Sequence, residues 1–388
     1  MKLLHVSDLG LKNLPYGGVN PDTGLNRRFE DVYKNWKLVI NEAIKNNVKY
    51  FIIAGDINEE RNPESILIEK FSEGVADLIS SDIHVIIIAG NHDVDSSKGT
   101  STSISYIKSL GLINTYVADV KVETFDFDDV VFHCVPYMFP NQVGVKTNDD
   151  VTKYLNEYIK NIKLDENKYN ILVSHYSLKT TFEGLDVDEP ILDNDLLGKF
   201  DYVALGHIHK YEMFDKFSGG YTGSLFCKDF GEQNDKYFNI VSFEETAPTR
   251  QGKLKRTNIE KIQIPERIFK QFDYDITNSN FGEIITDLGS KNLKDCIVKI
   301  KIKAHKRFKP TALYNLLKDN GVFHYAPIEW KIIRDEQIQK LEVSEAKSDT
   351  DIVDNYLQTQ PELKDDFKTK VKGYTKKIIK DWEEEQSL

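Results

Sequence analysis

Short apolar runs recur along roughly the first 245 residues of the chain. They lie at residues 3–6, 50–55, 84–90, 130–135, 170–175, 202–207 and 238–243. Each run has the length of a strand and is rich in β-branched or aromatic residues. The segments between them, such as residues 28–46, place apolar residues at helical spacing. This alternation predicts an α/β domain built around a buried sheet.

The pattern changes near residue 266. Strand-like runs then follow as FKQFDYDIT, DCIVKIKIKA and FHYAPIEWKII, and helices are predicted near residues 280–289 and 310–319. This mixture predicts a compact α+β domain over residues 266–335, after a first domain over residues 1–265.

Charged and polar residues dominate residues 336–388 until a terminal helix begins near Pro361. The helix carries one apolar stripe at i+3 and i+4 spacing, formed by Leu363, Phe367, Val371, Tyr374, Ile378 and Trp382. Such a stripe either packs against the protein's own core or docks on a partner, and both interpretations stay open. Our working prediction for residues 336–388 is a linker followed by a helical region that binds a partner.

Composition limits the classes of protein. With 388 residues and 40% hydrophobic content the chain can bury a sizeable core. None of its apolar stretches approaches the roughly 20 residues that cross a bilayer, so we expect a cytoplasmic protein that does not contact a membrane. The three cysteines are widely spaced, which leaves no disulfide framework and no CxxC zinc site. A net charge of -11 argues against general binding of polyanions, so any DNA must be bound locally.

Side chains that bind metals follow the ends of the apolar runs. They are Asp8, Asp56 in AGDIN, Asn91 in AGNHD, His175 in VSHYS, and His207 and His209 in GHIHK. In a mostly parallel sheet these strand ends converge on one crevice, and an extended GHIH segment points both of its histidines the same way. Taken singly, each residue is more simply a turn former or a satisfied polar side chain. Together they form an oxygen and nitrogen set that suits manganese, iron or zinc better than calcium or magnesium.

The ordered motifs HVSD, AGDIN, AGNHD, VSHYS and GHIHK resemble those of the calcineurin-like metallophosphoesterases. With the added domain and tail, the chain resembles the SbcD-like nuclease subunits of the DNA double-strand-break repair complex. That narrower resemblance depends on LHVSD, the loop NPDTGLNRRFEDV and the domain order. It implies a four-layer αββα sandwich, followed by a small α+β capping domain and a C-terminal helical tail.

The resemblance also implies two divalent metal ions, with Mn²⁺ expected. Two cations about 3.5–4 Å apart can stabilise both the attacking and the leaving oxygen of a phosphodiester during in-line displacement. By this resemblance Asp56 bridges the ions, Asn91, His175 and His207 complete one shell, and Asp8 and His209 bind the other ion. His92 would contact the scissile phosphate or protonate the leaving oxygen, with Asp93 as an orienting partner.

Position 10 departs from the family pattern. The first motif of the family reads D-x-H, whereas here Asp8 is followed by Leu9 and Gly10, and no histidine between His5 and His84 can replace the missing one. One imidazole of the first metal shell is therefore absent, which puts hydrolysis in doubt but not the fold. Because glycine adopts any backbone conformation that a histidine would use, we expect the change Gly10→His to restore manganese-dependent cleavage.

The densest basic segment is KIKIKAHKRFK. On a strand, Lys299, Lys301 and Lys303 share one face, which is either an ordinary solvated face or a contact with the DNA backbone, as the capping domain of SbcD-like nucleases suggests. Arg27 and Arg28 are weaker candidates for the same contact. In the family, the tail engages an SMC-type ATPase with a long coiled coil, named SbcC in bacteria.

Three functions remain in competition. The first is a metal-dependent DNA exonuclease and endonuclease that acts on DNA ends within an ATPase complex as a homodimer. The second is an architectural subunit that binds DNA ends and has lost catalysis through Gly10. The third is a small-molecule phosphodiesterase of the same superfamily, which would need neither the added domain nor the tail. A nuclease assay on linear duplex with manganese separates the first two.

Overall fold

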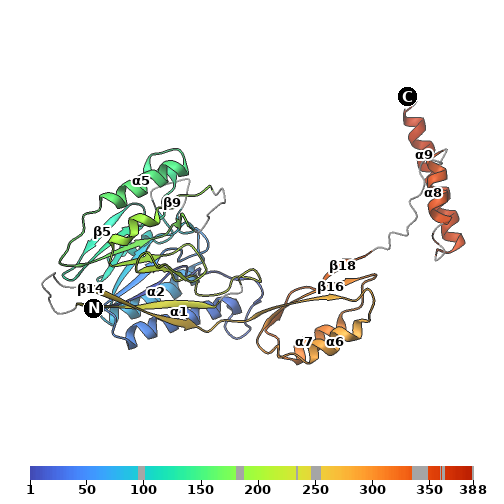
Figure 1. Cartoon of the computed structure of the whole chain (residues 1–388). Coiled ribbons are helices and arrows are strands. Elements are labelled where there is room, and N and C mark those ends of the chain that lie inside the picture. The colour runs from blue at the N-terminus through green and yellow to red at the C-terminus, as the bar shows by residue number, and fades with distance from the viewer. Residues whose placement is uncertain are drawn as a thin grey trace. The chain divides into compact units, whose positions relative to one another are not determined.

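The computed structural model describes residues 1–388 except 95–100, 181–187, 233–234, 246–254, 334–347, 359, 361–362 and 387–388 (Figure 1). Its first compact unit comprises residues 1–271, 292–299 and 317–326, and its second comprises residues 272–291, 300–316 and 327–388. After residue 271 successive stretches of the chain belong alternately to the two units. The domain bounds at 265 and 335 stay a prediction.

Two six-stranded sheets form the first part of the chain. The first sheet has the order β14-β13-β1-β2-β3-β4 and the second has the order β11-β12-β10-β7-β6-β5. The strands of the first sheet are β1 (Lys2–Val6), β2 (Tyr50–Ala54), β3 (His84–Ile88), β4 (Thr115–Ala118), β13 (Lys236–Glu245) and β14 (Lys255–Ile264). Strands β1 to β4 run parallel, and β13 joins β1 in the antiparallel direction. Four strand ends with the same polarity are therefore available along this sheet.

The second sheet contains a similar parallel core. Its strands are β5 (Glu123–Asp126), β6 (Val130–Val135), β7 (Tyr169–Ser174), β10 (Tyr202–Leu205), β11 (Glu212–Met213) and β12 (Gly219–Tyr221). Strand β7 lies between β6 and β10 and is parallel to both. The short strands β8 (Ser177–Leu178) and β9 (Ile191–Leu192) pair with each other beside the sheet.

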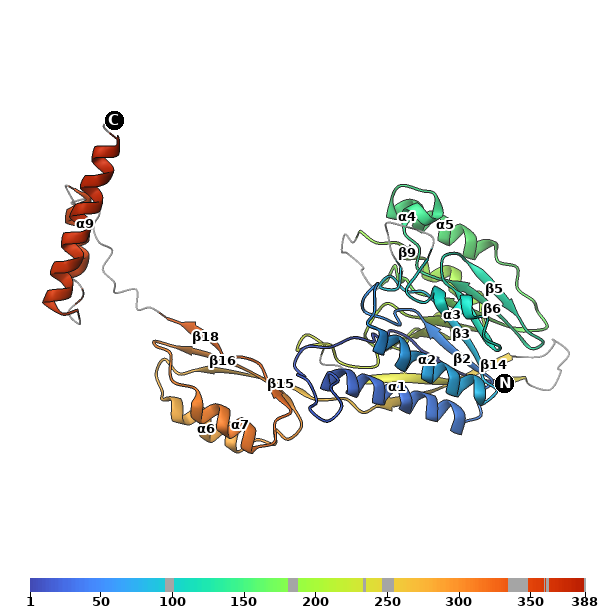
Figure 2. The same cartoon turned by 180° about the vertical axis from the view of Figure 1, so that it is seen from behind.

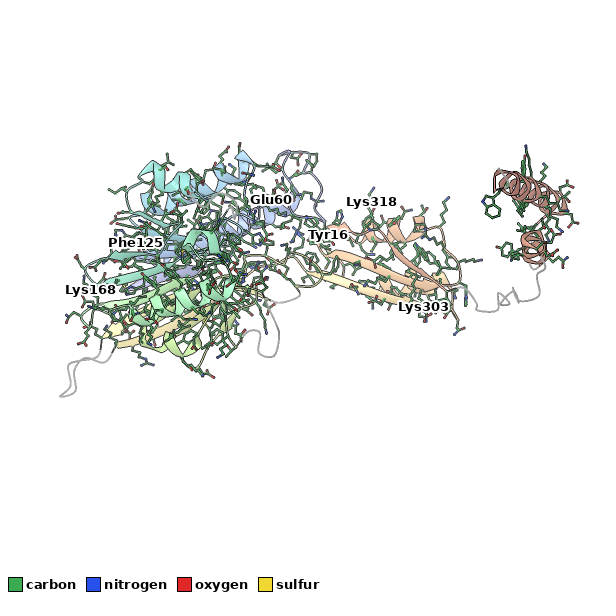
Figure 3. The ribbon with its side chains drawn as sticks, turned by 90° about the horizontal axis from the view of Figure 1, so that it is seen from above. Tyr16, Glu60, Phe125, Lys168, Lys303 and Lys318 are labelled. Atoms are coloured by element: carbon green, nitrogen blue, oxygen red, sulfur yellow. The ribbon has the colours of Figure 1, made fainter. Side chains whose placement is uncertain are left out.

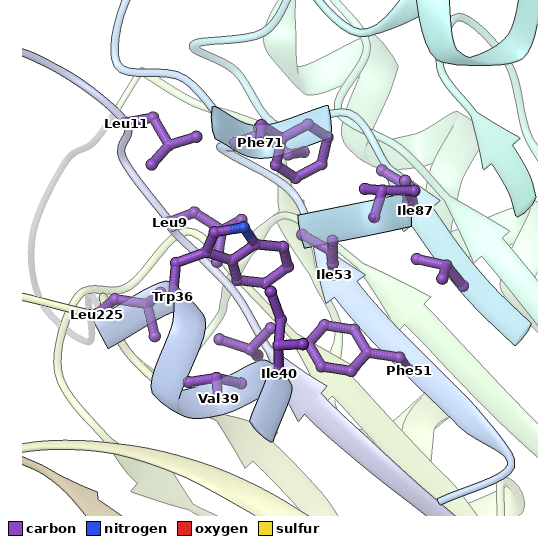
Figure 4. Close-up of a cluster of buried hydrophobic side chains, with 14 of the residues drawn as sticks. Leu9, Leu11, Trp36, Val39, Ile40, Phe51, Ile53, Phe71, Ile87 and Leu225 are labelled. Atoms are coloured by element: carbon purple, nitrogen blue, oxygen red, sulfur yellow. The ribbon is translucent and has the colours of Figure 1, made fainter. Parts of the chain in front are cut away.

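Buried clusters show how the layers stack. Leu4 and Val6 of β1 pack with helices α1 (Arg27–Lys45) and α2 (Ser65–Ser80), whereas Leu3 belongs to the cluster between the sheets. Trp36 of α1 stacks on Phe71 of α2, with ring centroids 5.7 Å apart (Figure 4). Helix α5 (Asn148–Asn161) covers the outer face of the second sheet. Figures 1 and 2 show the resulting order of helices, sheet, sheet and helices, which confirms the predicted αββα fold class.

Local signals explain where the main helices begin. Asn26 caps α1, because its side chain accepts hydrogen bonds from the backbone N–H groups of Arg28 and Phe29. Thr147 caps α5 through the N–H of Asp150. The shorter helices of this part are α3 (Ser105–Leu110), α4 (Pro140–Val143) and η1 (Asn194–Lys199).

A third sheet follows, in which β15, β16 and β17 are neighbours and β18 also pairs with β16. Its elements are β15 (Phe269–Asp275), α6 (Phe281–Gly289), β16 (Ile297–Ala304), α7 (Thr311–Asp319), β17 (His324–Tyr325) and β18 (Glu329–Ile332). Val298, Ile300 and Ile302 of β16 are buried, whereas the alternating lysines are half-buried. The basic side chains of β16 therefore share one face.

The tail consists of α8 (Asp349–Gln358) and α9 (Asp365–Gln386), which contact each other and share an ion pair of 3.2 Å between Lys372 and Asp354. Of the predicted stripe, Leu363 precedes α9, Val371 is half-buried, and Phe367, Tyr374, Ile378 and Trp382 are exposed by 53%, 70%, 67% and 57%. Across the described part of the chain, every helix is too short or too polar to span a bilayer.

Candidate metal centre

Strand ends from both sheets supply the predicted ligands. Asp8, Asp56 and Asn91 follow β1, β2 and β3 of the first sheet, whereas His175 and His207 follow β7 and β10 of the second. Within each sheet these strands run parallel, so their carboxyl ends lie at one edge. The two sheets pack face to face and therefore bring both sets of ends together.

The backbone at this edge is strained. Asp8 and Asp56 both have φ +50°, and His207 has φ +98°. Residues other than glycine adopt positive φ only rarely, and such conformations concentrate at functional sites. Hydrogen bonds hold them here, since Asp8 N donates to Gly55 O at 3.0 Å and His207 N donates to both carboxylate oxygens of Asp8 at 3.1 and 3.2 Å.

A glycine allows two of the loops to touch. A Cβ atom on Gly90 would overlap the Oδ1 and backbone N atoms of Asp56. The AGN turn after β3 therefore packs directly against the aspartate of the AGD turn after β2. This close contact leaves no room for a side chain at position 90 and explains why a glycine precedes Asn91.

The donor atoms of Asp8, Asp56 and His175 form the core of the site. One ligand atom from each lies within 4.8 Å of the others, and all three residues are buried. The Oδ1 atom of Asn91 lies 3.2 Å from His175 Nε2 and 3.0 Å from His207 Nδ1. Carboxylate and amide oxygens and imidazole nitrogens thus meet in one place, a set that suits manganese, iron or zinc.

The other predicted residues line the same edge. His209 Nε2 lies 3.9 Å from Asp8 Oδ1, and His92 Nε2 lies 4.0 Å from Asp56 Oδ2. The backbone N–H of His92 donates to Asp56 Oδ1 at 2.9 Å, while its imidazole is 40% exposed. His92 is therefore fixed at its backbone and presents its ring to the solvent.

Asp56 and His175 form a buried charge pair, with His175 Nε2 3.4 Å from Asp56 Oδ2. Burial alone would raise the pKa of Asp56, but the charge and hydrogen bond of His175 lower it to about 2. Burial likewise opposes protonation of His175, yet the Asp56 carboxylate raises the pKa of this imidazole to about 9. The pair is thus poised to hold one positive charge, either a proton or a cation.

Asp93 lies beneath the loops. It is buried and accepts hydrogen bonds from the backbone N–H groups of Gly90, Ile57 and Asn58 at 2.9, 3.2 and 3.2 Å. Burial, together with the charge of Asp56, raises the pKa of Asp93 to about 6. These bonds join the turns after β2 and β3, and a role of Asp93 in orienting His92 stays a prediction.

Two glutamates that the sequence analysis did not identify contact the histidines of the GHIH segment. Glu189 Oε2 lies 3.1 Å from His207 Nε2, and Glu232 Oε1 lies 2.5 Å from His209 Nδ1. The His209 hydrogen bond and the Lys236 charge outweigh burial and lower the pKa of Glu232 to about 2. Neither glutamate belongs to a strand-end motif, and their separations of 18 and 23 residues from the histidines follow no recognisable spacing.

Neighbouring side chains leave little space for a side chain at position 10. Gly10 has φ +55°, and a Cβ atom there would lie 2.8 Å from two ring atoms of Phe226 and 3.4 Å from Glu59 Cγ. Glu59 in turn pairs with Lys228, whose Nζ lies 2.8 Å from its carboxylate. The Phe226 ring and the Glu59 side chain therefore crowd the space into which a side chain at position 10 would extend.

The predicted DNA-binding residues belong to helix α1 and strand β16 rather than to these strand ends. The guanidinium of Arg28 is 1% exposed and donates to Cys227 O at 2.5 Å, and the guanidinium of Arg27 lies 4.1 Å from the ring centroid of Phe323. Lys303, labelled in Figure 3, pairs with Asp275 at 2.7 Å. Their roles in binding DNA stay predictions, as do those of Lys299 and Lys301.

Comparisons with known proteins identify the family to which the first part of the chain is similar. A sequence model described as calcineurin-like phosphoesterase matches residues 1–211, the span that contains all the predicted metal ligands. The cluster of Asp8, Asp56 and His175 therefore lies within the part of the chain that matches the family.

Curated relatives extend the similarity along the chain. A DNA double-strand break repair protein Mre11 from Methanocaldococcus jannaschii is 26% identical over 84% of this chain and 82% of its own length. A protein from Staphylococcus saprophyticus, named as one of the subunits of the nuclease SbcCD, is 25% identical over 74% of this chain and 80% of its own length. A Methanopyrus kandleri protein, also named DNA double-strand break repair protein Mre11, is 26% identical over 61% of this chain, which spans about half (51%) of that relative.

Proposed function

Since the chain belongs to the calcineurin-like phosphoesterase family, we propose that it is a metal-dependent DNA nuclease, with exonuclease and endonuclease activity, in an SbcCD-type recombination and repair complex. One observation carries the proposal: buried donor atoms of Asp8, Asp56 and His175 lie within 4.8 Å of one another. The relatives named as a break repair protein and a nuclease subunit support DNA as the substrate.

We propose that the site holds two divalent ions, with Mn²⁺ expected; the observed cluster of Asp8, Asp56 and His175 supports this proposal. Asp56, Asn91, His175 and His207 would hold one ion, and Asp8, Asp56 and His209 would hold the other. When bound, the ions supply the positive charge that stabilises attacking and leaving oxygens of a phosphodiester. The protein contributes the convergence of strand ends from two sheets, which keeps the donors in place before a metal arrives.

His92 is the proposed group for proton transfer. Its backbone is anchored on Asp56 while its ring faces solvent, so the imidazole can reach a phosphate or a leaving oxygen at the mouth of the site. Asp93 fixes the turn that carries His92 through its hydrogen bonds to the backbone of both loops. We assign Asp93 this supporting role and His92 the contact with substrate.

Gly10 favours a second candidate, a subunit that binds DNA ends without cleaving them. The first ion would lack an imidazole, and Phe226 occupies the space beside Gly10. The proposed partners are the same in both cases, namely DNA ends, an SbcC-like ATPase and a second copy of the chain, and we propose a cytoplasmic location. A small-molecule phosphodiesterase would use neither the basic face of β16 nor the exposed stripe of α9.

A nuclease assay on linear duplex DNA with manganese tests the proposal. Asp56→Asn should abolish cleavage, because it removes the carboxylate shared by both shells. The matched control is Asp126→Asn on β5, which changes the same charge at an exposed ion pair with Lys168. Cleavage that is absent from the parent protein, together with retained binding of DNA ends, would favour the second candidate.

A further inference from the structure

His209 is held on its far side by a carboxylate. Its Nδ1 atom lies 2.5 Å from Glu232 Oε1, whereas its Nε2 atom faces Asp8 Oδ1 at 3.9 Å. A carboxylate only accepts hydrogen bonds, so the proton of a neutral His209 ring sits on Nδ1. The separation from Asp8 is too long for a hydrogen bond, which leaves the Nε2 lone pair directed toward the metal centre.

A buried ammonium holds Glu232 in turn. Lys236 begins β13 and is 1% exposed, and its Nζ lies 3.3 Å from Glu232 Oε2. The same Nζ donates to Ser224 Oγ at 2.8 Å and to the backbone oxygen of His209 at 3.0 Å. All three donors of the ammonium are therefore used, and two of the three bonds converge on His209, one directly and one through Glu232.

A buried lysine is an unusual solution for a structural position. Removing an ammonium from water costs several kcal/mol, and a buried ion pair often stabilises a fold no better than apolar residues of similar volume. The bonds of Lys236 instead fix both the backbone and the ring of one histidine. A carboxylate behind a metal-binding histidine fixes the tautomer and the direction of the ring.

We propose that Glu232, held by Lys236, is a positioning residue that keeps His209 in the Nδ1–H tautomer with Nε2 aimed at the ion beside Asp8. This inference rests on the proposed function for the metal site and assigns to that site two residues outside the strand-end motifs. The positioning of His209 matters most for the ion beside Asp8, because with glycine at position 10 His209 is the sole imidazole expected to bind that ion.

Glu189 provides a matched control on the same chain. It contacts His207 Nε2 at 3.1 Å, on the side of the ring opposite the Nδ1 that faces Asn91. Glu189→Gln and Glu232→Gln both replace one carboxylate with an isosteric amide behind one histidine of GHIH. If the pairing is specific, each change alters the ring that it touches and leaves the other unchanged.

The first test uses metal-free, full-length protein with ¹⁵N-labelled histidine, at a pH at which the His209 ring is neutral. Long-range ¹H–¹⁵N spectra report the tautomer of each ring, and the variant His209→Gln identifies the His209 signals. We expect the Nδ1–H pattern in the parent protein and a mixture of tautomers in Glu232→Gln, while Glu189→Gln leaves the His209 signals unchanged. An unchanged Nδ1–H pattern in Glu232→Gln overturns the inference.

The second test measures Mn²⁺ affinity by electron paramagnetic resonance. Glu232→Gln should weaken the affinity of the ion beside Asp8 by about 10–100-fold, the usual effect of losing an outer partner of a ligand. Lys236→Met should weaken it in the same direction, and circular dichroism checks that this variant folds. Equal affinity in the parent protein and Glu232→Gln counts against the inference.

Asp56→Asn distinguishes a failure of the proposed metal site from a failure of the positioning role of Glu232. If this variant binds Mn²⁺ as tightly as the parent protein, the proposed function is wrong, whereas the tautomer measurement on metal-free protein still decides the role of Glu232. If Asp56→Asn loses the metal and Glu232→Gln changes neither tautomer nor affinity, the metal site stands and the positioning role fails.

Discussion

The ring of Phe226 lies 2.8 Å from the point at which a Cβ atom on Gly10 would sit. Phe226 is itself buried, within the cluster between the first sheet and its helices. The glycine and the phenylalanine therefore complement each other in shape, and a larger residue at position 10 requires the ring to move.

This contact changes the expected effect of Gly10→His. Histidine is among the residues that tolerate the left-handed conformation observed at position 10, but its Cβ would overlap the Phe226 ring. We predict that Gly10→His alone recovers little Mn²⁺ affinity, and that Gly10→His combined with Phe226→Ala recovers at least about tenfold more, as expected for a restored ligand.

A double-mutant cycle checks this prediction. Phe226→Ala alone should lower the stability of the protein by about 3–5 kcal/mol, the usual effect of truncating a buried phenylalanine, without gaining metal affinity. Free imidazole added to Phe226→Ala should partly substitute for the missing ligand. If Gly10→His alone restores Mn²⁺ binding and cleavage fully, the ring yields easily and the contact is not a barrier.

The basic face of β16 should contribute to DNA binding through its charge. Replacing Lys299, Lys301 and Lys303 with alanine should lower the slope of log affinity against log salt by about 2 or more, since each lost phosphate contact contributes about 0.9. Lys301 should contribute more than Lys303, because Lys303 already pairs with Asp275.

Fluorescence anisotropy at several salt concentrations measures that slope. Lys153→Ala combined with Lys160→Ala on α5 removes charge from another surface and should leave the slope nearly unchanged. A slope that survives the loss of all three β16 lysines would show that their face is merely solvated.

The exposed side chains of α9 should bind the partner ATPase. Tyr374, Ile378 and Trp382 are each more than half exposed, and aromatic anchors carry much of the energy of protein interfaces. Replacing all three with glutamine should weaken binding of an SbcC-like ATPase by about 100-fold or more.

Lys370→Gln combined with Lys376→Gln offers a control on the same helix, since both lysines belong to α9 outside the stripe. Pull-down and calorimetric titration measure binding, and the melting temperature reports the fold. A fall in melting temperature after the three apolar changes would instead place the stripe in the protein's own core.

His5 should make stability fall in acid. The ring is buried between the sheets, with Nδ1 2.9 Å from the Tyr202 hydroxyl, and burial lowers the pKa of His5 from 6.5 to about 3. The unfolded chain therefore binds one more proton than the folded chain between these values. This contribution to stability is complete above about pH 6.5 and is lost as the pH falls, with a slope of up to about 1.4 kcal/mol per pH unit.

Urea denaturation between pH 4 and pH 7 measures this dependence. His5→Phe should flatten the acid slope, while Tyr202→Phe removes the hydrogen bond, costs about 1 kcal/mol and keeps the slope. Equal slopes in the parent protein and His5→Phe would show that other groups cause the acid sensitivity.

The sequence identified strands where their apolar runs were continuous. The run at residues 130–135 coincides with β6, and the run at 50–55 differs from β2 by one residue. By contrast β14 was not predicted, because its charged and apolar residues are mixed along a strand at the sheet edge. Helix α8 was missed as well, because its few apolar residues, among them Ile352, Val353 and Leu357, lie within a segment of mostly polar residues.

The sequence likewise identified some residues of the candidate site and not others. Asp8, Asp56 and His175 could be found because each follows an apolar run, and the structure brings them together. Phe226 and Glu232 could not, since their roles depend on which distant loops meet. Hydrophobic periodicity reports on a residue's own element, whereas a contact across the fold leaves no local pattern.

The metal centre is built at the seam between two sheets, and this position gives it a second consequence. Asp8, Asp56 and Asn91 come from one sheet, and His175 and His207 come from the other. A cation bound among them would therefore link the two sheets. At a concentration of 100 times its dissociation constant, such an ion adds about 2.7 kcal/mol of stability. Chelation removes this link, so it should raise the rate of amide hydrogen exchange at the ends of β2 and β10 together, because the two sheets can then separate locally.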